Sequence, residues 1–182
     1  MDLVTGISVF VLLAALLLPF LAHVLRRHPR WLAAAKYVIL GVYILANLYE
    51  TILFRAVQPN RRAEWELLWS YRASLAFPDG LMSLLNGSVE VTMPSLLEEI
   101  ILNILLYIPM GYLLPFTFKR LKAWHVVLIA LLCSVVTEVS QLVFRIGWFE
   151  YDDMLNNTMG CVLGLILYGL LMRRPVRKGA QV

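Results

Sequence analysis

Acidic and amide side chains stand at helical spacing inside two apolar segments of this sequence. Glu138, Gln141 and Arg145 follow one another at i, i+3 and i+7, so a helix would place them on one face. Asp153 precedes Asn157 by four residues in the next segment. If Glu138 and Asp153 lie close together, they could act as a general acid and base, because two neighbouring carboxylates do not ionise equally easily. The same groups could instead bind a polar headgroup.

The elements that carry these residues belong in a membrane. The 182 residues are 60% hydrophobic and 15% charged, and the mean hydropathy is +0.75, which is too apolar for a soluble domain. We predict an all-α membrane protein, a bundle of about five transmembrane helices. The first is expected to be a retained helix rather than a signal peptide. Each apolar segment is near the roughly 20 residues that a bilayer needs: 3–25, 33–54, 96–118, 124–144 and 154–172.

The basic residues predict the orientation of these helices. Three clusters fall in the connections that must share one side, and the positive-inside rule assigns that side to the cytoplasm. The N-terminus, the long loop 56–95 and the short loop 146–153 are then outside, and the C-terminus is cytoplasmic. The clusters serve topology rather than nucleic-acid binding: Arg26, Arg27, Arg30 and Lys36; Lys119, Arg120 and Lys122; Arg173, Arg174, Arg177 and Lys178.

The long outer loop is expected to contain an amphipathic interfacial segment. Trp65, Leu68, Trp69, Arg72 and Leu75 recur at helical spacing, which favours a helix lying along the membrane surface. The predicted units are an extra N-terminal transmembrane helix (1–30), a second transmembrane helix (31–55), the extracytoplasmic interfacial loop (56–95), a three-helix core (96–172) and a basic cytoplasmic tail (173–182).

Polar residues from four segments reach the same level of the membrane in this topology. The helical rise places four of them roughly 6 to 12 Å below the outer boundary, where they could converge in one pocket: Glu50, Asn103, Glu138 and Asn157. Arg55 and Arg145 either extend to the outer interface or pair with Glu50 or Glu138. The predicted binding residues are Asn103, Glu138, Gln141, Asp153, Asn157, Glu50, Arg55, Arg145 and Glu150.

Some of these residues also have purely structural explanations. An ionisable group inside a span costs roughly 2.5 kcal/mol or more unless it is paired or hydrated. For Glu138 we therefore favour a site or an obligatory buried network. Asp152 and Asp153 could simply cap the last helix and interact with its dipole, and Glu98 and Glu99 could do the same for the third segment. Both explanations stay open for these four carboxylates.

The histidines limit the chemistry of the outer face. His23, His28 and His125 all fall at the predicted cytoplasmic ends, so neither a zinc site nor a Ser-His hydrolase has a histidine there. No cofactor and no metal are expected, although carboxylate and amide oxygens could hold a divalent cation. Gly160 and Gly164 form a small-xxx-small pair, which favours close helix packing.

Three sequence motifs resemble the VanZ-like family of teicoplanin-resistance proteins. They are Asn-Ile-Leu-Leu-Tyr-Ile-Pro-Met-Gly from Asn103 to Gly111, Glu-Val-Ser-Gln from Glu138 to Gln141, and Asp-Met-Leu-Asn-Asn-Thr-Met-Gly from Asp153 to Gly160. The resemblance covers roughly 96–171, with a weaker echo at 51–55, and leaves the first segment outside. It implies lowered susceptibility to teicoplanin and similar lipoglycopeptides. The polar motif residues that it carries over are Asn103, Glu138, Gln141, Asp153 and Asn157.

Three functions remain in competition. The first is a protein that binds or remodels a membrane lipid, a lipid-linked cell-wall precursor or the lipoglycopeptide itself in an outward-facing pocket. The second is an intramembrane enzyme that uses Glu138 and Asp153 on a lipid-linked substrate. The third is a small transporter, or a subunit of a membrane complex, for which an oligomer would compensate for the small number of spans.

Overall fold

The computed structural model describes residues 29–53, 55–76 and 96–172 of the chain. The predicted first transmembrane segment and the basic tail lie outside these residues. Every statement below refers to the described part.

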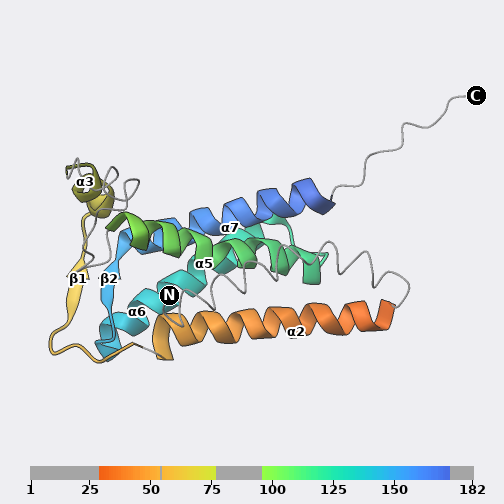
Figure 1. Ribbon diagram of the computed structural model, residues 1–182, viewed down its shortest axis with the longest axis horizontal. Coiled ribbons are helices and arrows are strands. Elements are labelled where there is room, and N and C mark those ends of the chain that lie inside the picture. Colours follow the sequence, from red (N-terminus) through yellow and green to blue (C-terminus); the bar gives the residue numbers. More distant parts are fainter. Residues whose placement is uncertain (1–28, 54, 77–95, 173–182) are drawn as a thin grey trace, which may run out of the picture.

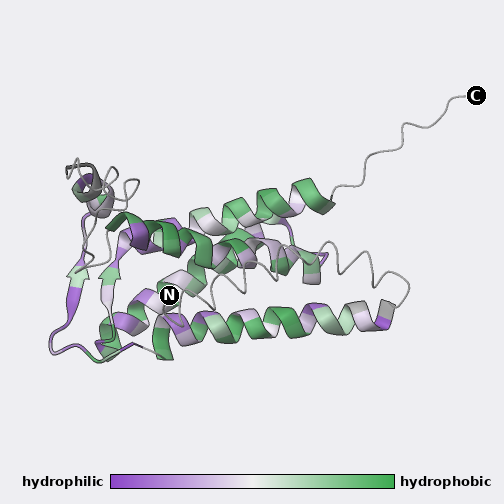
Figure 2. Cartoon of the chain, viewed as in Figure 1, coloured by the Kyte–Doolittle hydropathy of each residue, from purple (hydrophilic) through white to green (hydrophobic). Residues whose placement is uncertain are grey.

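Four of the predicted membrane segments are helices that are long and apolar enough to cross a bilayer. They lie lengthwise beside one another in Figure 1, much of their length is coloured as hydrophobic in Figure 2, and many of their large apolar side chains are exposed. An exposed apolar surface of this extent is expected where lipid replaces water. The elements are α2 (Pro29–Leu48), continued by a π-helical turn η2 (Tyr49–Leu53), then α5 (Leu96–Thr117), α6 (Ala123–Phe144) and α7 (Tyr151–Met172).

Glycines bring α5 and α7 into backbone contact. A Cβ atom added at Gly160 would lie 2.1 Å from the carbonyl oxygen of Ile104, and one at Gly164 would lie 2.0 Å from that of Ile108. On the other side, a Cβ at Gly111 would lie 1.9 Å from a backbone oxygen of α7. The packing role predicted for Gly160 and Gly164 is thereby confirmed. Ile104 lies against Gly160 and Ile108 lies against Gly164. Because the residue numbers rise together along both helices, α5 and α7 run parallel and begin at the same end.

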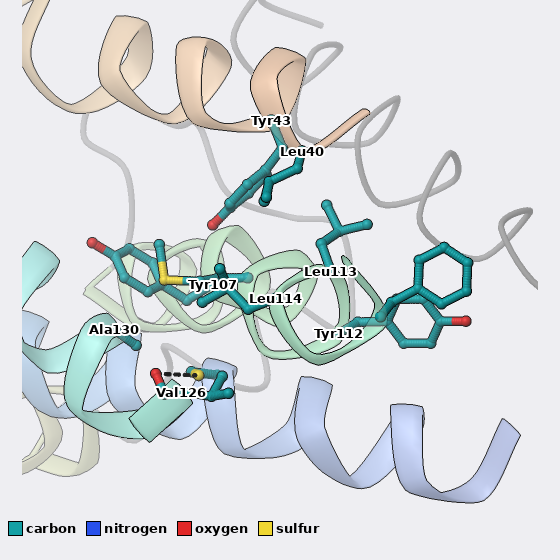
Figure 3. Packing of buried hydrophobic residues seen from close by; sticks show 11 residues of the cluster. Leu40, Tyr43, Tyr107, Tyr112, Leu113, Leu114, Val126 and Ala130 are labelled. Atoms are coloured by element: carbon teal, nitrogen blue, oxygen red, sulfur yellow. Dashed lines mark hydrogen bonds between the residues drawn. The ribbon is translucent and has the colours of Figure 1, made fainter. Parts of the chain in front are cut away.

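Aromatic and aliphatic side chains fill the space between the helices below that end. Figure 3 shows Tyr43 of α2 pointing toward α5, where its hydroxyl donates a hydrogen bond to the carbonyl oxygen of Leu106 at 3.1 Å. On the other side, the thiol of Cys161 on α7 lies 3.8 Å from the carbonyl oxygen of Val126 on α6. The four helices therefore share one apolar core, which holds the polar end above it in a fixed arrangement.

The polar end contains structure that the sequence did not predict. Strands β1 (Arg62–Glu64) and β2 (Trp148–Glu150) pair in parallel, with Arg62 opposite Trp148. Both stretches were predicted to be loops, so this expectation is corrected. Two strands this short carry no period-2 signal of their own, and their pairing joins segments more than 80 residues apart.

The predicted interfacial helix begins later than expected. Helix α3 spans Trp69–Ala76, whereas the predicted segment began at Trp65. Leu68 has a φ of 65°, a left-handed conformation that stops a helix from extending back through it. Trp65 instead packs against Phe149 of β2, with ring centroids 4.8 Å apart. The segment is therefore attached to the bundle by specific contacts.

Candidate functional site

The helices α5, α6 and α7 are joined at their polar end by side-chain hydrogen bonds. Asn103 of α5 donates to Asp153 of α7 at 2.6 Å. Asn157 of α7 donates to the hydroxyl of Ser134 on α6 at 2.8 Å, in a fully buried contact. Polar groups at this depth are expensive unless they are paired, and these pairs satisfy much of that requirement.

Glu138 lies beneath strand β2 and supports it. Its side chain is 1% exposed, and Oε2 accepts a 2.9 Å hydrogen bond from the backbone amide of Glu150. One helical turn further along α6, the amide of Gln141 donates to the carbonyl oxygen of Thr51 at 3.2 Å. Glu138 therefore helps to hold Glu150 in place, together with the pairing of β2 with β1.

A cavity of about 490 Å³ opens above these bonds. One guanidinium and three carboxylates line it, together with two tryptophans and several apolar groups. Apolar walls around a few charged groups are typical of sites for small or amphiphilic ligands. The charged lining residues are Arg55, Glu99, Glu150 and Asp153, and the others that matter below are Leu96, Trp69, Gly147 and Trp148.

Arg55 is the basic residue of this cavity, and it remains available to a ligand. Its charge attracts those of Glu50, Glu138 and Asp153. Even so, within the described ranges the structure contains no ion pair between Arg55 and a carboxylate. Its side chain is exposed. A guanidinium in this situation can donate paired hydrogen bonds to a phosphate or carboxylate.

Gly147 makes room for that guanidinium. A Cβ atom at this position would lie 2.7 Å from Oε1 of Gln141 and 3.0 Å from Nη1 of Arg55. Oε1 of Gln141 is itself buried and accepts no hydrogen bond from the residues that the structure describes. The glycine therefore lies against both Arg55 and a spare acceptor.

Glu150 is the carboxyl group of the cavity that lies outside the membrane-spanning segments. Burial raises its pKa to about 8, and the negative charges of Asp153 and Glu99 contribute in the same direction. The indole N–H of Trp69, which donates to Oε2 of Glu150 at 3.2 Å, opposes this rise. At neutral pH, Glu150 is therefore mostly protonated and can donate as well as accept a hydrogen bond.

Asp152 lies in the first turn of α7, but its carboxylate caps the start of α3. Its carboxylate accepts hydrogen bonds from the backbone amides of Leu68 and Ser70, at 2.5 and 2.9 Å, and from the hydroxyl of Ser70 at 2.6 Å. These amides belong to the start of α3, where a helix leaves its N–H groups without partners. The side chain of Asp152 is fully buried. The sequence-based explanation assigned this carboxylate to the cap of the last helix, whereas its observed hydrogen bonds are to the start of α3.

Further contacts tie α3 to α7 and close one side of the cavity. The hydroxyl of Tyr71 donates a short hydrogen bond to Oδ1 of Asn156. Trp69, held by Glu150, forms part of the cavity wall. Trp69 of the segment 62–76 thus contributes to a wall of the site, and the bonds to Asp152, Glu150 and Asn156 help to position this segment.

The residues predicted from the sequence fall into three groups. Arg55, Glu150 and Asp153 line the cavity. Asn103, Glu138, Gln141 and Asn157 lie in hydrogen bonds between elements. The remaining two are apart from both: Oε1 of Glu50 is buried without a hydrogen-bond partner in the described part, and Arg145 ends α6 in a left-handed conformation with an exposed side chain.

Several residues of the site were not predicted from the sequence. Glu99 lines the cavity, but its place in the first turn of α5 offered a complete structural explanation. Trp69 had been assigned to the face of an interfacial helix. Asn156, which accepts a hydrogen bond from Tyr71, was not singled out because the helical spacing from Asp153 pointed to Asn157 instead. Within 29–76 and 96–172, no group of three His, Cys, Asp or Glu side chains is arranged to hold a metal ion.

The fold and this site define a multi-pass membrane protein with a polar cavity at one end of its helices. The sequence profile of the VanZ/LLP1 family matches residues 9–172, and the chain belongs to this family. The match begins far before the region on which the resemblance rested. The first apolar segment was expected to lie outside the family, and the match corrects this expectation because it includes most of that segment.

The chain is also similar to Protein VanZ of Enterococcus faecium. The two are 39% identical over 73 residues, which make up 40% of this chain and 45% of that protein. The alignment thus spans less than half of the relative. No solved structure matches the chain.

Proposed function

We propose that this protein binds an amphiphile of the cell envelope through the cavity around Arg55, and that this binding lowers susceptibility to teicoplanin-type lipoglycopeptides. The amphiphile is a membrane lipid or a lipid-linked cell-wall precursor. The observation that carries the proposal is a cavity of about 490 Å³ that combines apolar walls and carboxyl groups with a guanidinium that forms no ion pair with the described residues. Its opening faces outward in the topology predicted from the basic residues.

The charged groups suit a headgroup that contains both an anion and hydroxyls. Arg55 offers hydrogen bonds to a phosphate, while Asp153 and Glu99 can accept them from sugar hydroxyls. Glu150, mostly protonated at neutral pH, adds little negative charge that would repel the phosphate. A glycosyl phosphate headgroup meets these requirements together.

A separate apolar groove of about 320 Å³ lies between α2, α5 and α6 and suits the hydrocarbon chain of the same ligand. Ile52 lines the groove and Arg55 lines the cavity, only three residues further along the chain. A headgroup at Arg55 could therefore extend its chain along Ile52 and Val136 toward Met110.

Membership of the VanZ/LLP1 family supports the resistance part of the proposal. The aligned relative carries the name Protein VanZ, and the family resemblance implies a teicoplanin phenotype. The polar residues that carry the resemblance also build the hydrogen bonds beneath the cavity. A bound lipid or precursor that changes the cell surface would connect this site to the phenotype.

Catalysis on a lipid-linked substrate is the second candidate. The observation that favours it is that two carboxyl groups, Glu150 and Asp153, line the cavity, and that the pKa of Glu150 is about 8, in the range useful to a general acid. Glu138, the other half of the pair predicted from the sequence, is buried beneath β2 and does not line the cavity. Asp153→Asn, which keeps the size and the ability to accept from Asn103, would abolish acid-base catalysis but weaken binding only modestly.

The test compares two arginines at the same end of the molecule. Cells that express the wild type, Arg55→Gln or Arg145→Gln at matched protein levels are assayed for teicoplanin and vancomycin susceptibility. We expect the wild type and Arg145→Gln to protect against teicoplanin and Arg55→Gln to lose most of the protection. Full protection by Arg55→Gln would contradict the binding role of the cavity. If the wild type does not protect, the resistance function fails for this member of the family.

A further inference from the structure

A second cavity lies at the opposite end of the bundle, away from the proposed headgroup site. It has a volume of about 740 Å³ and is bordered by α2, by the turn that joins α5 to α6, and by the start of α6. Tyr37 of α2 and Phe118 of the turn meet edge to face beside it, with ring centroids 5.9 Å apart. This aromatic contact joins α2 to the turn and gives the cavity two sides.

Basic side chains line this cavity, and no carboxylate of the described residues forms an ion pair with them. Lys119 and Arg120 are exposed at its rim. Lys36 approaches from α2, where its ammonium lies 4.6 Å from the ring centroid of Phe116. The carboxylates of the described ranges belong to η2, β1, the following turn, β2 and the polar ends of α5, α6 and α7. The positive charge at the basic end is therefore not neutralised by this part of the protein.

Apolar side chains line the deeper part of this cavity. Leu114 and Ile129 extend the lining toward the middle of the helices. A ligand that fits must be anionic at the rim and apolar further in.

We propose that this cavity binds the headgroup and upper acyl chain of an anionic phospholipid. Lys119 and Arg120 contact the phosphodiester, and an acyl chain lies along Leu114 and Ile129. Basic pockets between transmembrane helices are suited to anionic headgroups, and each cation near the phosphate strengthens its binding. Leu114 and Ile129 also line the apolar groove between α2, α5 and α6, but the basic rim takes no part in the function proposed for the other end.

A simpler role for the same basic residues is to set the orientation of the helices. That role requires only that the charges lie near the membrane surface, so every lysine or arginine at this end should be equivalent. A binding cavity instead distinguishes those that line it from those that do not. Lys122 provides the comparison, because it is exposed close to Arg120 but does not line the cavity.

The test measures lipid binding to the purified full-length protein in detergent. Binding of phosphatidylglycerol and of phosphatidylcholine is followed by native mass spectrometry, and thermal stabilisation by each lipid and by inorganic phosphate is measured in parallel. We expect phosphatidylglycerol to be preferred. Lys119→Gln combined with Arg120→Gln should weaken its binding roughly tenfold or more, whereas Lys122→Gln should have little effect.

Three results would overturn the proposal. Equal binding of the two lipids would remove the anionic preference, and an equal loss in Lys122→Gln would reduce the effect to general surface charge. Stabilisation by inorganic phosphate equal to that by phosphatidylglycerol would identify the ligand as a free anion. Unchanged elution from size exclusion and unchanged binding of detergent by the variants would establish that their folds are intact.

Discussion

At the polar end of the bundle, carboxylates such as Asp152 and Glu138 are buried and bonded to backbone amides, whereas at the basic end Lys119 and Arg120 are exposed and have no acidic partner in the described structure. The first arrangement uses charge to hold segments of the protein together. The second leaves charge available to something outside the protein. The same kind of substitution should therefore damage the fold at one end and only ligand binding at the other.

The largest effect is expected where the polar end depends on contact between helices. Gly160→Ala would place a Cβ 2.1 Å from the carbonyl oxygen of Ile104, so α5 and α7 must separate. We expect a destabilisation of about 3 kcal/mol or more, measured by thermal unfolding in detergent. Gly169→Ala on the same helix is the control, because nothing lies within 4 Å of its Cβ. Similar melting of both variants would contradict the close α5–α7 contact.

A smaller loss of stability is expected for Asp152→Ala. Without the carboxylate, the amides of Leu68 and Ser70 lose their acceptor, and the start of α3 is released from α7. The expected cost is about 1 to 3 kcal/mol, seen as faster hydrogen exchange at Ser70. Glu66→Ala removes only the exposed ion pair with Arg72 and should leave exchange unchanged. Protection of Ser70 that persists in Asp152→Ala would show that α3 is held by other contacts.

A further effect, the dependence of stability on pH, should come largely from Glu150. Its pKa of about 8 in the folded protein exceeds the ordinary value of 4.5, so the folded state binds a proton more tightly than the unfolded state. This contribution to stability is complete below about pH 4.5 and is lost as the pH rises to about 8. We expect the melting temperature to fall over this interval and Glu150→Gln to flatten the change. An unaltered pH profile in Glu150→Gln would assign the titration to another group.

The smallest effect on stability is expected at the basic end. Arg120→Gln should change the free energy of unfolding by less than about 0.5 kcal/mol in lipid-free detergent, because no described residue depends on its charge. The measurement is the same thermal unfolding used for Asp152→Ala. A loss as large as that of Asp152→Ala would show that both ends use charge to maintain the fold.

The helices and the level of the polar residues could be predicted from the sequence because both depend on local regularities. Runs of apolar residues predicted four helices of the bundle, and the helical rise alone placed Asn103 and Glu138 at one end. The glycine pair in α7 was also recognisable, since two small residues four positions apart, Gly160 and Gly164, indicate close packing against another helix.

The cavity and its outer wall could not be predicted in the same way. Asp152 and Ser70 are 82 residues apart, and nothing near either one indicates the other. The pairing of β1 with β2 is equally non-local. Glu99 was difficult for a different reason: an acidic residue in a first turn already has a sufficient local explanation, so its place on the cavity wall adds no sequence signal.

The central claim is that the cavity at the polar end binds the headgroup of a lipid amphiphile. Trp148 lines the cavity and is exposed, so a photoreactive phenylalanine derivative can replace it, with Leu170, which is exposed at the far end of α7, as the matched site. After illumination in cells, the adducts are identified by mass spectrometry. The account predicts that one lipid or lipid-linked precursor is strongly enriched at position 148 over the bulk lipids captured at position 170, and that Arg55→Gln removes this enrichment. The same mixture of lipids at both positions would contradict it.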